Sequence, residues 1–184
     1  YGDCAGEFVC ETRMAKPQTD RARRRLDAET QVRAWSKKTG CFSVVLRVPG
    51  IYASDRLPLK RLMSGLSAVN ASEDSFTNHI HADDLARIIF FALSRGVNGR
   101  IYNCADDSRI KAGDYFDLIA IRSGLPLPPR VSRSEAERIL SSVSWSFLRE
   151  SRLISNNRMK RELKVRLAYP TVNDGVPNNI TSPS

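Results

Sequence analysis

Two short apolar runs limit what this chain can fold into more than any other feature of its sequence. They are CFSVVLRV at Cys41–Val48 and GRIYNCA at Gly99–Ala105, and both have the composition of buried strands. The segment between them, His81–Gly96, contains an amphipathic helix with acidic residues in its first turn. Strands that alternate with helices are typical of an α/β fold. We therefore predict parallel strands at Ser43–Val48 and Arg100–Cys104.

Helical periodicity and capping residues predict the helices around these strands. The longest are expected at 20–38, 83–95 and 112–123, and shorter ones at 57–63, 132–140 and 155–163. Thr19 or Asp20 is expected to cap the first helix, and Gly40 to end it. Ser132 opens a capping box, and Ser155 is expected to cap the 155–163 helix.

Two strands are too few for a stable parallel sheet. Residues 1–18, before the first predicted helix, have the composition of a loop. We therefore expect this chain to be the second half of a larger fold. Residues 177–184 are expected to be a disordered tail.

Composition excludes several classes of protein. No apolar run approaches the about 18 residues that a membrane span needs, and the first residues lack the basic and apolar regions of a signal peptide. Cys4, Cys10, Cys41 and Cys104 form no C-x-x-C pair, which argues against zinc and disulfides and favours reduced thiols in the cytoplasm. The formal net charge of +9 can attract anions, among them nucleic acid, nucleotide cofactors and phosphosugars.

Four segments, in the same order, resemble motifs of the extended short-chain dehydrogenases/reductases, in particular of the NAD-dependent epimerase/dehydratase family. LRVPGIYA at Leu46–Ala53 resembles LRPGNVYGP, and NHIHADDLARIIFFAL at Asn78–Leu93 resembles FIHVDDVARAILLAL. GRIYNCADDSRIKAGDYFDLIA at Gly99–Ala120 looks like GEVYNVGG…TVRELAELIA, and SNNRMKRELKVRLAYPTVNDGV at Ser155–Val176 looks like DTSKARRELGWRPRVSLEEGL. Including Tyr1-Gly2, which is similar to the end of the family's VYG, the resemblance covers residues 1–176.

The resemblance implies a partial Rossmann-like fold: a doubly wound parallel sheet that lacks its N-terminal dinucleotide-binding half, followed by a small, mostly helical substrate region. The family's G-x-x-G-x-x-G turn is absent, since none of the ten glycines forms even a G-x-G. We therefore expect an N-terminally truncated fragment of a cytoplasmic NAD- or NADP-dependent protein, whose substrate is a nucleotide-sugar or a related small molecule. The chain alone is expected to bind dinucleotide poorly. A homodimer is compatible with the resemblance.

The arginine-rich stretch RARRRLDAE, residues 21–29, matches the helix on which the family carries Y-x-x-x-K. Aligned on its Ala28-Glu29, the stretch has Arg21 at the position of the Tyr and Arg25 at that of the Lys. By this resemblance Arg25 can donate hydrogen bonds to ribose or phosphate, whereas Arg21 stays protonated and cannot exchange a proton with substrate. The catalytic residues are therefore unknown.

Two other interpretations of this stretch stay open. It could be a solvated, salt-bridged helix face or a nucleic-acid patch, and the absence of interleaved aromatic residues disfavours the patch. If it is the cofactor helix, residues 21, 25 and 29 share one face, and Arg23 and Arg24 point to solvent.

Pro49, Gly50 and Ile51 match family residues whose backbone approaches the nicotinamide, so the resemblance assigns them to cofactor binding. The alternative is a simple turn that ends a strand. In an extended segment the side chains of His79 and His81 lie on one side, which allows a metal site. We favour instead a strand-to-helix junction that His81 caps, and expect no metal.

Two alternatives to an epimerase/dehydratase follow from these residues. A non-catalytic NAD(P)-binding or regulatory protein of the same superfamily is favoured by Arg21 in place of Tyr. A basic module that binds nucleic acid or another polyanion is favoured by the net charge alone. A glycine-rich strand–turn–helix encoded in frame upstream would exclude the basic module.

Overall fold

The computed structural model describes residues 1–180, and its strands form two-stranded pairs. β2 (Val44–Arg47) pairs in parallel with β7 (Arg100–Asn103), with Val44 opposite Arg100. The two strands predicted from the apolar runs, and their parallel pairing, are therefore confirmed.

The sequence analysis predicts none of the other pairs, because each of their strands is only two or three residues long. Three are parallel: β1 (Phe8–Val9) with β10 (Leu153–Ile154), β3 (Gly50–Tyr52) with β6 (His79–His81), and β4 (Ala68–Val69) with β9 (Arg130–Val131). The fourth, β5 (Phe76–Thr77) with β8 (Ile110–Lys111), is antiparallel. The Pro49-Gly50 turn thus carries the chain from one strand pair directly into another.

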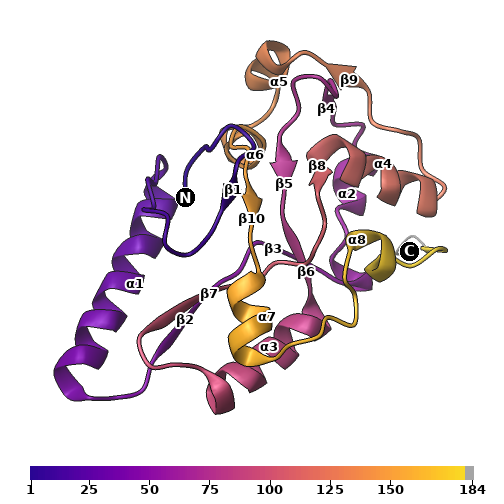
Figure 1. The fold of residues 1–184 in the computed structure, drawn as a ribbon. Helices are drawn as coiled ribbons and strands as arrows, with labels where there is room; N and C mark the ends of the chain where they lie inside the picture. Colours follow the sequence, from indigo (N-terminus) through magenta and orange to yellow (C-terminus); the bar gives the residue numbers. More distant parts are fainter. Residues whose placement is uncertain (181–184) are drawn as a thin grey trace.

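Helices flank the strands along the whole chain (Figure 1). The three long predicted helices are α1 (Asp20–Thr39), α3 (Ala82–Arg95) and α4 (Ala112–Arg122). The shorter ones are α2 (Leu59–Met63), α5 (Arg133–Ile139), α6 (Ser142–Leu148), α7 (Asn157–Leu163), α8 (Val172–Gly175) and the 3-10 turn η1 (Ser54–Arg56). The sequence analysis does not predict α6 or α8.

Several predicted helix ends are confirmed. The hydroxyl of Thr19 accepts the N–H of Ala22 at 3.2 Å, and Gly40, with φ of 74°, ends α1 in the left-handed region. The hydroxyl of Ser132 accepts the N–H of Glu135 at 3.2 Å. These ends depend on residues three or four positions apart, which is why the sequence predicts them.

The predicted cap of α7 is wrong by one residue. Asn156, and not Ser155, precedes the first helical residue. The Asn156 Nδ2 donates to the carbonyls of Ala105 and Asp106, at 2.8 and 3.2 Å. These long-range hydrogen bonds fix Asn156 at the start of the helix.

Three buried clusters hold the helices against the strands, and two of them lie around β3, β6 and β7. One contains side chains of β6, β7, α3 and α7, namely Ile80, Tyr102, Ile88, Ala92, Met159 and Leu163. The other contains side chains of β3, α2, α4 and α8, namely Tyr52, Leu59, Leu62, Tyr115, Ile119 and Val172. Each large apolar side chain buried in this way contributes about 1.5–3 kcal/mol to folding.

Asp84, in the first turn of α3, joins this helix to the C-terminal segment. The carboxylate is fully buried, and it accepts the N–H of Ala168 and the N–H of Tyr169, both at 2.8 Å. Arg87 donates to it at 3.3 Å. A buried charge needs such partners, and here two of the three come from residues more than eighty positions away.

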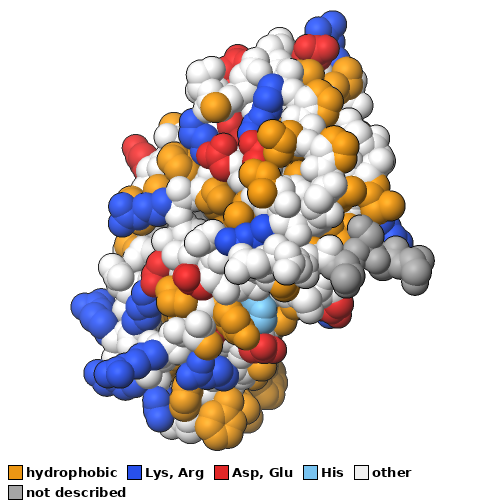
Figure 2. Space-filling model, turned by 90° about the vertical axis from the view of Figure 1, so that its right-hand side faces the viewer, with side chains coloured by type: hydrophobic (Ala, Val, Ile, Leu, Met, Phe, Trp, Pro, Cys, Tyr) orange, Lys and Arg blue, Asp and Glu red, His pale blue; other side chains and the backbone are white. Residues whose placement is uncertain are grey.

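Much of α1 and α3 is open to solvent. Within the 20 residues of α1, Ser36 is the one buried residue. In α3 the predicted apolar stripe is split, since Ile88 is buried but Ile89 and Leu93 are 46% and 72% exposed. Figure 2 shows hydrophobic side chains gathered beside basic ones at the lower end of the molecule.

The C-terminal end of the described chain lies against the rest of the molecule. The N–H of Ile180 donates to the carbonyl of Arg122 at 3.1 Å, and its side chain packs against the cluster that contains Tyr52. Residues 181–184 of the predicted tail lie outside the described residues. No helix among residues 1–180 is long and apolar enough to cross a membrane.

Candidate functional site

Arg47, the last residue of β2, links the arginine-rich helix to the strands. Its Nη2 lies 2.8 Å from Glu29 Oε2, and its Nε donates to Glu29 Oε1 at 3.0 Å. Both side chains are largely buried. Burial acts to lower the pKa of Arg47, and its hydrogen bonds to Glu29 together with the nearby Tyr1 phenol more than offset it, so the pKa stands above its ordinary value. This pair fixes the rotation of α1 relative to β2.

Tyr1 covers the other side of the Arg47 guanidinium. The Arg47 Cζ lies 4.8 Å from the centroid of the Tyr1 ring. The Tyr1 hydroxyl donates to Asn103 Oδ1 at 2.8 Å, and burial raises the pKa of this phenol. The hydroxyl is therefore a stable hydrogen-bond donor and not a group poised to lose its proton.

Asn103, at the end of β7, is fully buried and joins three segments. Besides Tyr1, it contacts Glu11, whose Oε1 accepts the Asn103 N–H at 3.0 Å. Its Nδ2 donates to the carbonyl of Ser155 at 3.2 Å. Glu11 in turn lies 3.7 Å from the Nε of Arg158. The network holds the N-terminal segment over the carboxyl end of β7.

The arginines of α1 occupy different surroundings. The Arg21 guanidinium lies 4.1 Å from the centroid of the Phe147 ring in α6, and Arg23 pairs with Asp20 at 2.6 Å. The Arg25 side chain is exposed and forms no hydrogen bond or ion pair with another described residue. Residues 21, 25 and 29 share one helix face. Arg25 therefore lies between Arg21, which contacts α6, and Glu29, which contacts β2.

The Pro49–Ile51 segment, whose last two residues begin β3, is partly open to solvent. Gly50 is exposed, and Ile51 is 39% exposed. The Gly50 N–H donates to the carbonyl of Asn78 at 3.2 Å, and an ideal Cβ at Gly50 would lie 3.2 Å from the imidazole Cδ2 of His79. A side chain at position 50 would therefore crowd His79 of β6. Among residues 1–180, no hydrogen bond or ion pair joins the Arg25 side chain to this segment. The Glu29–Arg47 pair links α1 to the end of β2, two residues before Pro49.

The two histidines take structural roles. His81 Nδ1 accepts the N–H of Asp83 at 3.2 Å, which confirms the predicted cap of α3. His79 stacks on Tyr115 with ring centroids 4.0 Å apart, and both histidines stand edge-on to Tyr52. Burial lowers the pKa of His79 to about 4, so the ring is neutral near pH 7. Among residues 1–180, no group of three or more His, Cys, Asp or Glu is arranged to hold a metal ion.

The residues around Arg47 include free hydrogen-bond donors and exposed backbone. Arg25 has free donors for a ribose hydroxyl or a phosphate, and the exposed Gly50 offers backbone to a flat ring. Pyrophosphate binding needs a glycine-rich turn at a helix N-terminus, and residues 1–180 contain no such turn. The sequence analysis misses Arg47 and Glu11; a single Arg inside an apolar strand is the signal that points to a buried ion pair.

Comparisons with known proteins define the fold. No protein-family model and no curated protein matches the sequence significantly. A functionally unknown conserved protein from Silicibacter pomeroyi is 33% identical and matches 95% of this chain with a TM-score of 0.84. A dTDP-glucose 4,6-dehydratase from Bacillus anthracis, solved in complex with NAD, is 18% identical and matches 95% with a TM-score of 0.71. A UDP-glucose 4-epimerase from Thermotoga maritima, solved with UDP-glucose, is 14% identical and matches 94% with a TM-score of 0.73.

The chain spans 60%, 55% and 55% of the length of these three proteins. The predicted fold class, a partial Rossmann-like α/β fold of the kind found in NAD-dependent epimerases and dehydratases, is therefore confirmed.

Proposed function

We propose that this chain belongs to the NAD-dependent epimerase/dehydratase family and forms the C-terminal portion of an NAD(P)-dependent protein, with a nucleotide-sugar or a related small molecule as substrate. The observation that carries this proposal is the Glu29–Arg47 pair, which joins α1, one helical turn after Arg25, to the end of β2. Similar folds solved with NAD or with a nucleotide-sugar support it.

In this proposal the residues have separate roles in binding the cofactor. Arg25 donates a charge-assisted hydrogen bond to ribose or phosphate. The backbone of Pro49, Gly50 and Ile51 lines the nicotinamide end of the site. NAD(P) would supply hydride transfer when bound. The proton-transfer group is a residue other than Arg21, since a guanidinium keeps its proton.

A second candidate is a non-catalytic NAD(P)-binding or regulatory protein. The specific observation in its favour is Arg21, whose guanidinium is stacked on Phe147 at 4.1 Å. A cation–π contact is worth about 0.5–1 kcal/mol at an exposed site, which suits a residue that holds α6 against α1 rather than one that reacts.

The test is calorimetric titration of NAD(H) and NADP(H) into the longest natural polypeptide that contains these 184 residues. Arg25→Ala is expected to weaken binding about tenfold or more, since each decade corresponds to about 1.4 kcal/mol. Arg24→Ala, another exposed arginine of α1, is the matched control and should leave the affinity unchanged. Equal losses of affinity in both variants would mean that the arginines of α1 attract the negatively charged dinucleotide only through their diffuse positive charge. Binding without turnover of dTDP-glucose or UDP-glucose would favour the second candidate.

A further inference from the structure

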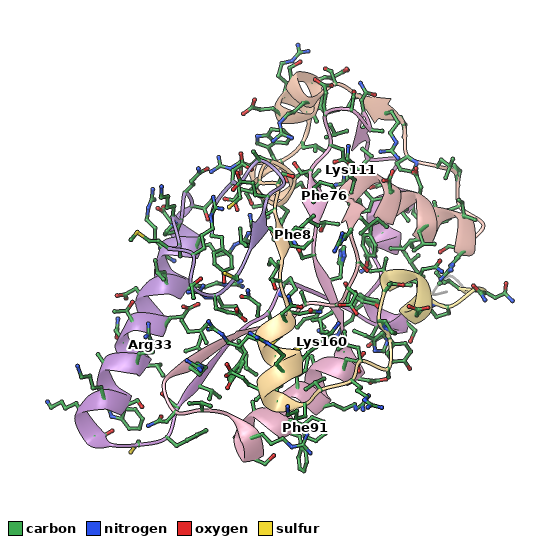
Figure 3. The ribbon with its side chains drawn as sticks, viewed as in Figure 1. Phe8, Arg33, Phe76, Phe91, Lys111 and Lys160 are labelled. Carbon is green, nitrogen blue, oxygen red and sulfur yellow. The ribbon has the colours of Figure 1, made fainter. Side chains whose placement is uncertain are left out.

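A pocket of about 410 Å³ lies between the second half of α1 and the loop that leads into β7. Figure 3 shows Arg33, one of its lining residues, on α1. The volume falls within the about 300–1,000 Å³ that is usual for small-molecule pockets. The lining residues are Arg33, Ala34, Ser36, Lys37, Asn98 and Gly99.

This pocket and the proposed cofactor residues lie at opposite ends of the strands. Gly99 immediately precedes β7, whereas Pro49–Ile51 follows the carboxyl end of β2. Because β2 and β7 are parallel, their amino ends lie at the same edge. On α1, Arg33 is about 12 Å along the helix axis from Arg25. A ligand in this pocket would therefore be additional to a dinucleotide.

Two cationic side chains line the pocket. Arg33 and Lys37 are four residues apart on α1, so they share one face of the helix. Both are exposed, and neither forms an ion pair with a carboxylate among residues 1–180. The sequence has no Asp or Glu from Thr30 to Ser54, and no lining residue is acidic. The pocket therefore has a positive potential that its own walls do not neutralise.

Asn98 adds a neutral donor whose orientation is fixed. Its Oδ1 accepts the backbone N–H of Ser43 at 2.8 Å. A backbone N–H is met by the oxygen of a side-chain amide and not by its nitrogen, so Nδ2 takes the other side. Among residues 1–180, Nδ2 has no acceptor. The Ser36 hydroxyl donates to the carbonyl of Cys41 at 2.6 Å and holds the end of α1 against the chain that enters β2.

These donors select among classes of anion. A phosphate monoester carries about −1.5 to −2 charge near pH 7 and has three acceptor oxygens, which match two cations and one amide. A carboxylate has a single charge, and so has each phosphodiester of a nucleic acid. A free phosphate ion is much smaller than the pocket, so the carbon skeleton of an ester has room beside it.

We propose that this pocket binds the phosphoryl dianion of a small phosphate monoester, with Arg33 and Lys37 as charged donors and Asn98 as a neutral one. Hydrogen bonds assisted by charge are roughly twice as strong as neutral ones. The site does not depend on the proposed dinucleotide site. A failure here leaves the calorimetric test of Arg25 untouched.

The test is a phosphorus NMR titration of the 184-residue chain with glycerol 3-phosphate, inorganic phosphate and dimethyl phosphate as probes. The salt concentration is held at about 0.15 M, where charges more than about 8 Å apart are largely screened. We expect saturable binding of glycerol 3-phosphate with a dissociation constant on the order of 1 mM. Inorganic phosphate, the other source of the same dianion, should bind more weakly, and the monoanionic diester at least about fivefold more weakly.

Lys37→Ala and Lys38→Ala are a matched pair of variants. Both remove one positive charge from an exposed position of α1, but Lys38 does not line the pocket. Lys37→Ala and Arg33→Ala should each weaken binding about fivefold or more, and Lys38→Ala less than about twofold. Because all three side chains are exposed, these variants should fold. Asn98→Asp keeps an acceptor for the Ser43 N–H but places a carboxylate against the ligand, so binding should be lost.

Three results would overturn the proposal. The first is that glycerol 3-phosphate shows no saturable binding to wild type. The second is an equal loss of affinity in Lys37→Ala and Lys38→Ala, which would mean that the probe responds only to the net charge of α1. The third is that inorganic phosphate or dimethyl phosphate binds as tightly as glycerol 3-phosphate, since the pocket would then not select a monoester.

Discussion

Gly175 in α8 lies directly against the buried ring of Tyr52. An ideal Cβ at Gly175 would meet the Tyr52 hydroxyl first, and would stand 2.8 and 2.9 Å from the ring atoms Cε2 and Cζ. Tyr52 cannot easily move away, because His79 and His81 stand edge-on to its ring at centroid distances of 6.2 and 5.1 Å. The C-terminal helix is thereby fixed on the residue that follows the Pro49–Ile51 turn.

Gly175→Ala is expected to lower the free energy of unfolding by about 1–3 kcal/mol, because overpacking a rigid contact forces side chains out of their rotamers. The backbone at Gly175 has no positive φ, so the added methyl group is the whole perturbation. Chemical denaturation measures the loss. In a Tyr52→Phe background the nearest clashing atom is gone, and the cost of Gly175→Ala should be smaller; an equal cost would contradict the contact.

Glu29→Gln is expected to destabilise the protein by about 1.5–3 kcal/mol, because hydrogen bonds to a charged group are lost or weakened while Arg47 stays largely buried. Asp27→Asn is the control and should cost far less, because its position in α1 is exposed and, among residues 1–180, its carboxylate accepts a side-chain hydrogen bond from Gln31 alone. Urea unfolding of both variants compares them. Similar losses would show that Glu29 does not hold α1 in place.

His79 makes stability fall in acid. Its pKa is lowered by burial to about 4 from an ordinary 6.5, so the unfolded chain binds the proton first as the pH falls. Folding stability should therefore decrease between about pH 6.5 and 4, by on the order of 3 kcal/mol. His79→Phe keeps the ring on Tyr115 and should flatten this part of the pH profile. Thermal unfolding at several pH values measures this dependence. If His79→Phe loses stability in acid as steeply as wild type, another group causes the loss.

Asp106 acts in the opposite direction. Burial raises the pKa of its carboxyl to about 7 from 3.8, so the folded state holds a proton that the unfolded state has already lost. Stability should therefore fall as the pH rises between about 4 and 7. Asp106→Asn removes this titration and is expected to gain stability, relative to wild type, by more than about 1 kcal/mol from pH 5 to pH 8. A constant difference in the free energy of unfolding between wild type and Asp106→Asn from pH 5 to pH 8 would contradict the raised pKa of Asp106.

Local sequence determined the helices and the central strand pair. Thr19 and Gly40 bound α1 because a cap depends on hydrogen bonds within three or four residues. The run that became β7 is mostly buried and the run that became β2 is half-buried, and a parallel pairing follows from the helix between them. The resemblance to epimerases and dehydratases, stated from four motifs, likewise gave the fold class that the structural neighbours share.

Only the tertiary structure decided which polar residues are partnered. Asp84 and Asp106 are both acidic residues beside strand ends in the sequence, yet one accepts two N–H groups from the C-terminal segment and the other keeps a free oxygen. The same holds for the arginines: Arg47 is bound by Glu29, whereas Arg25 has no partner among residues 1–180. Burial and partnering depend on residues tens of positions away, and such contacts leave no periodic signal in the chain, whereas caps and apolar stripes do.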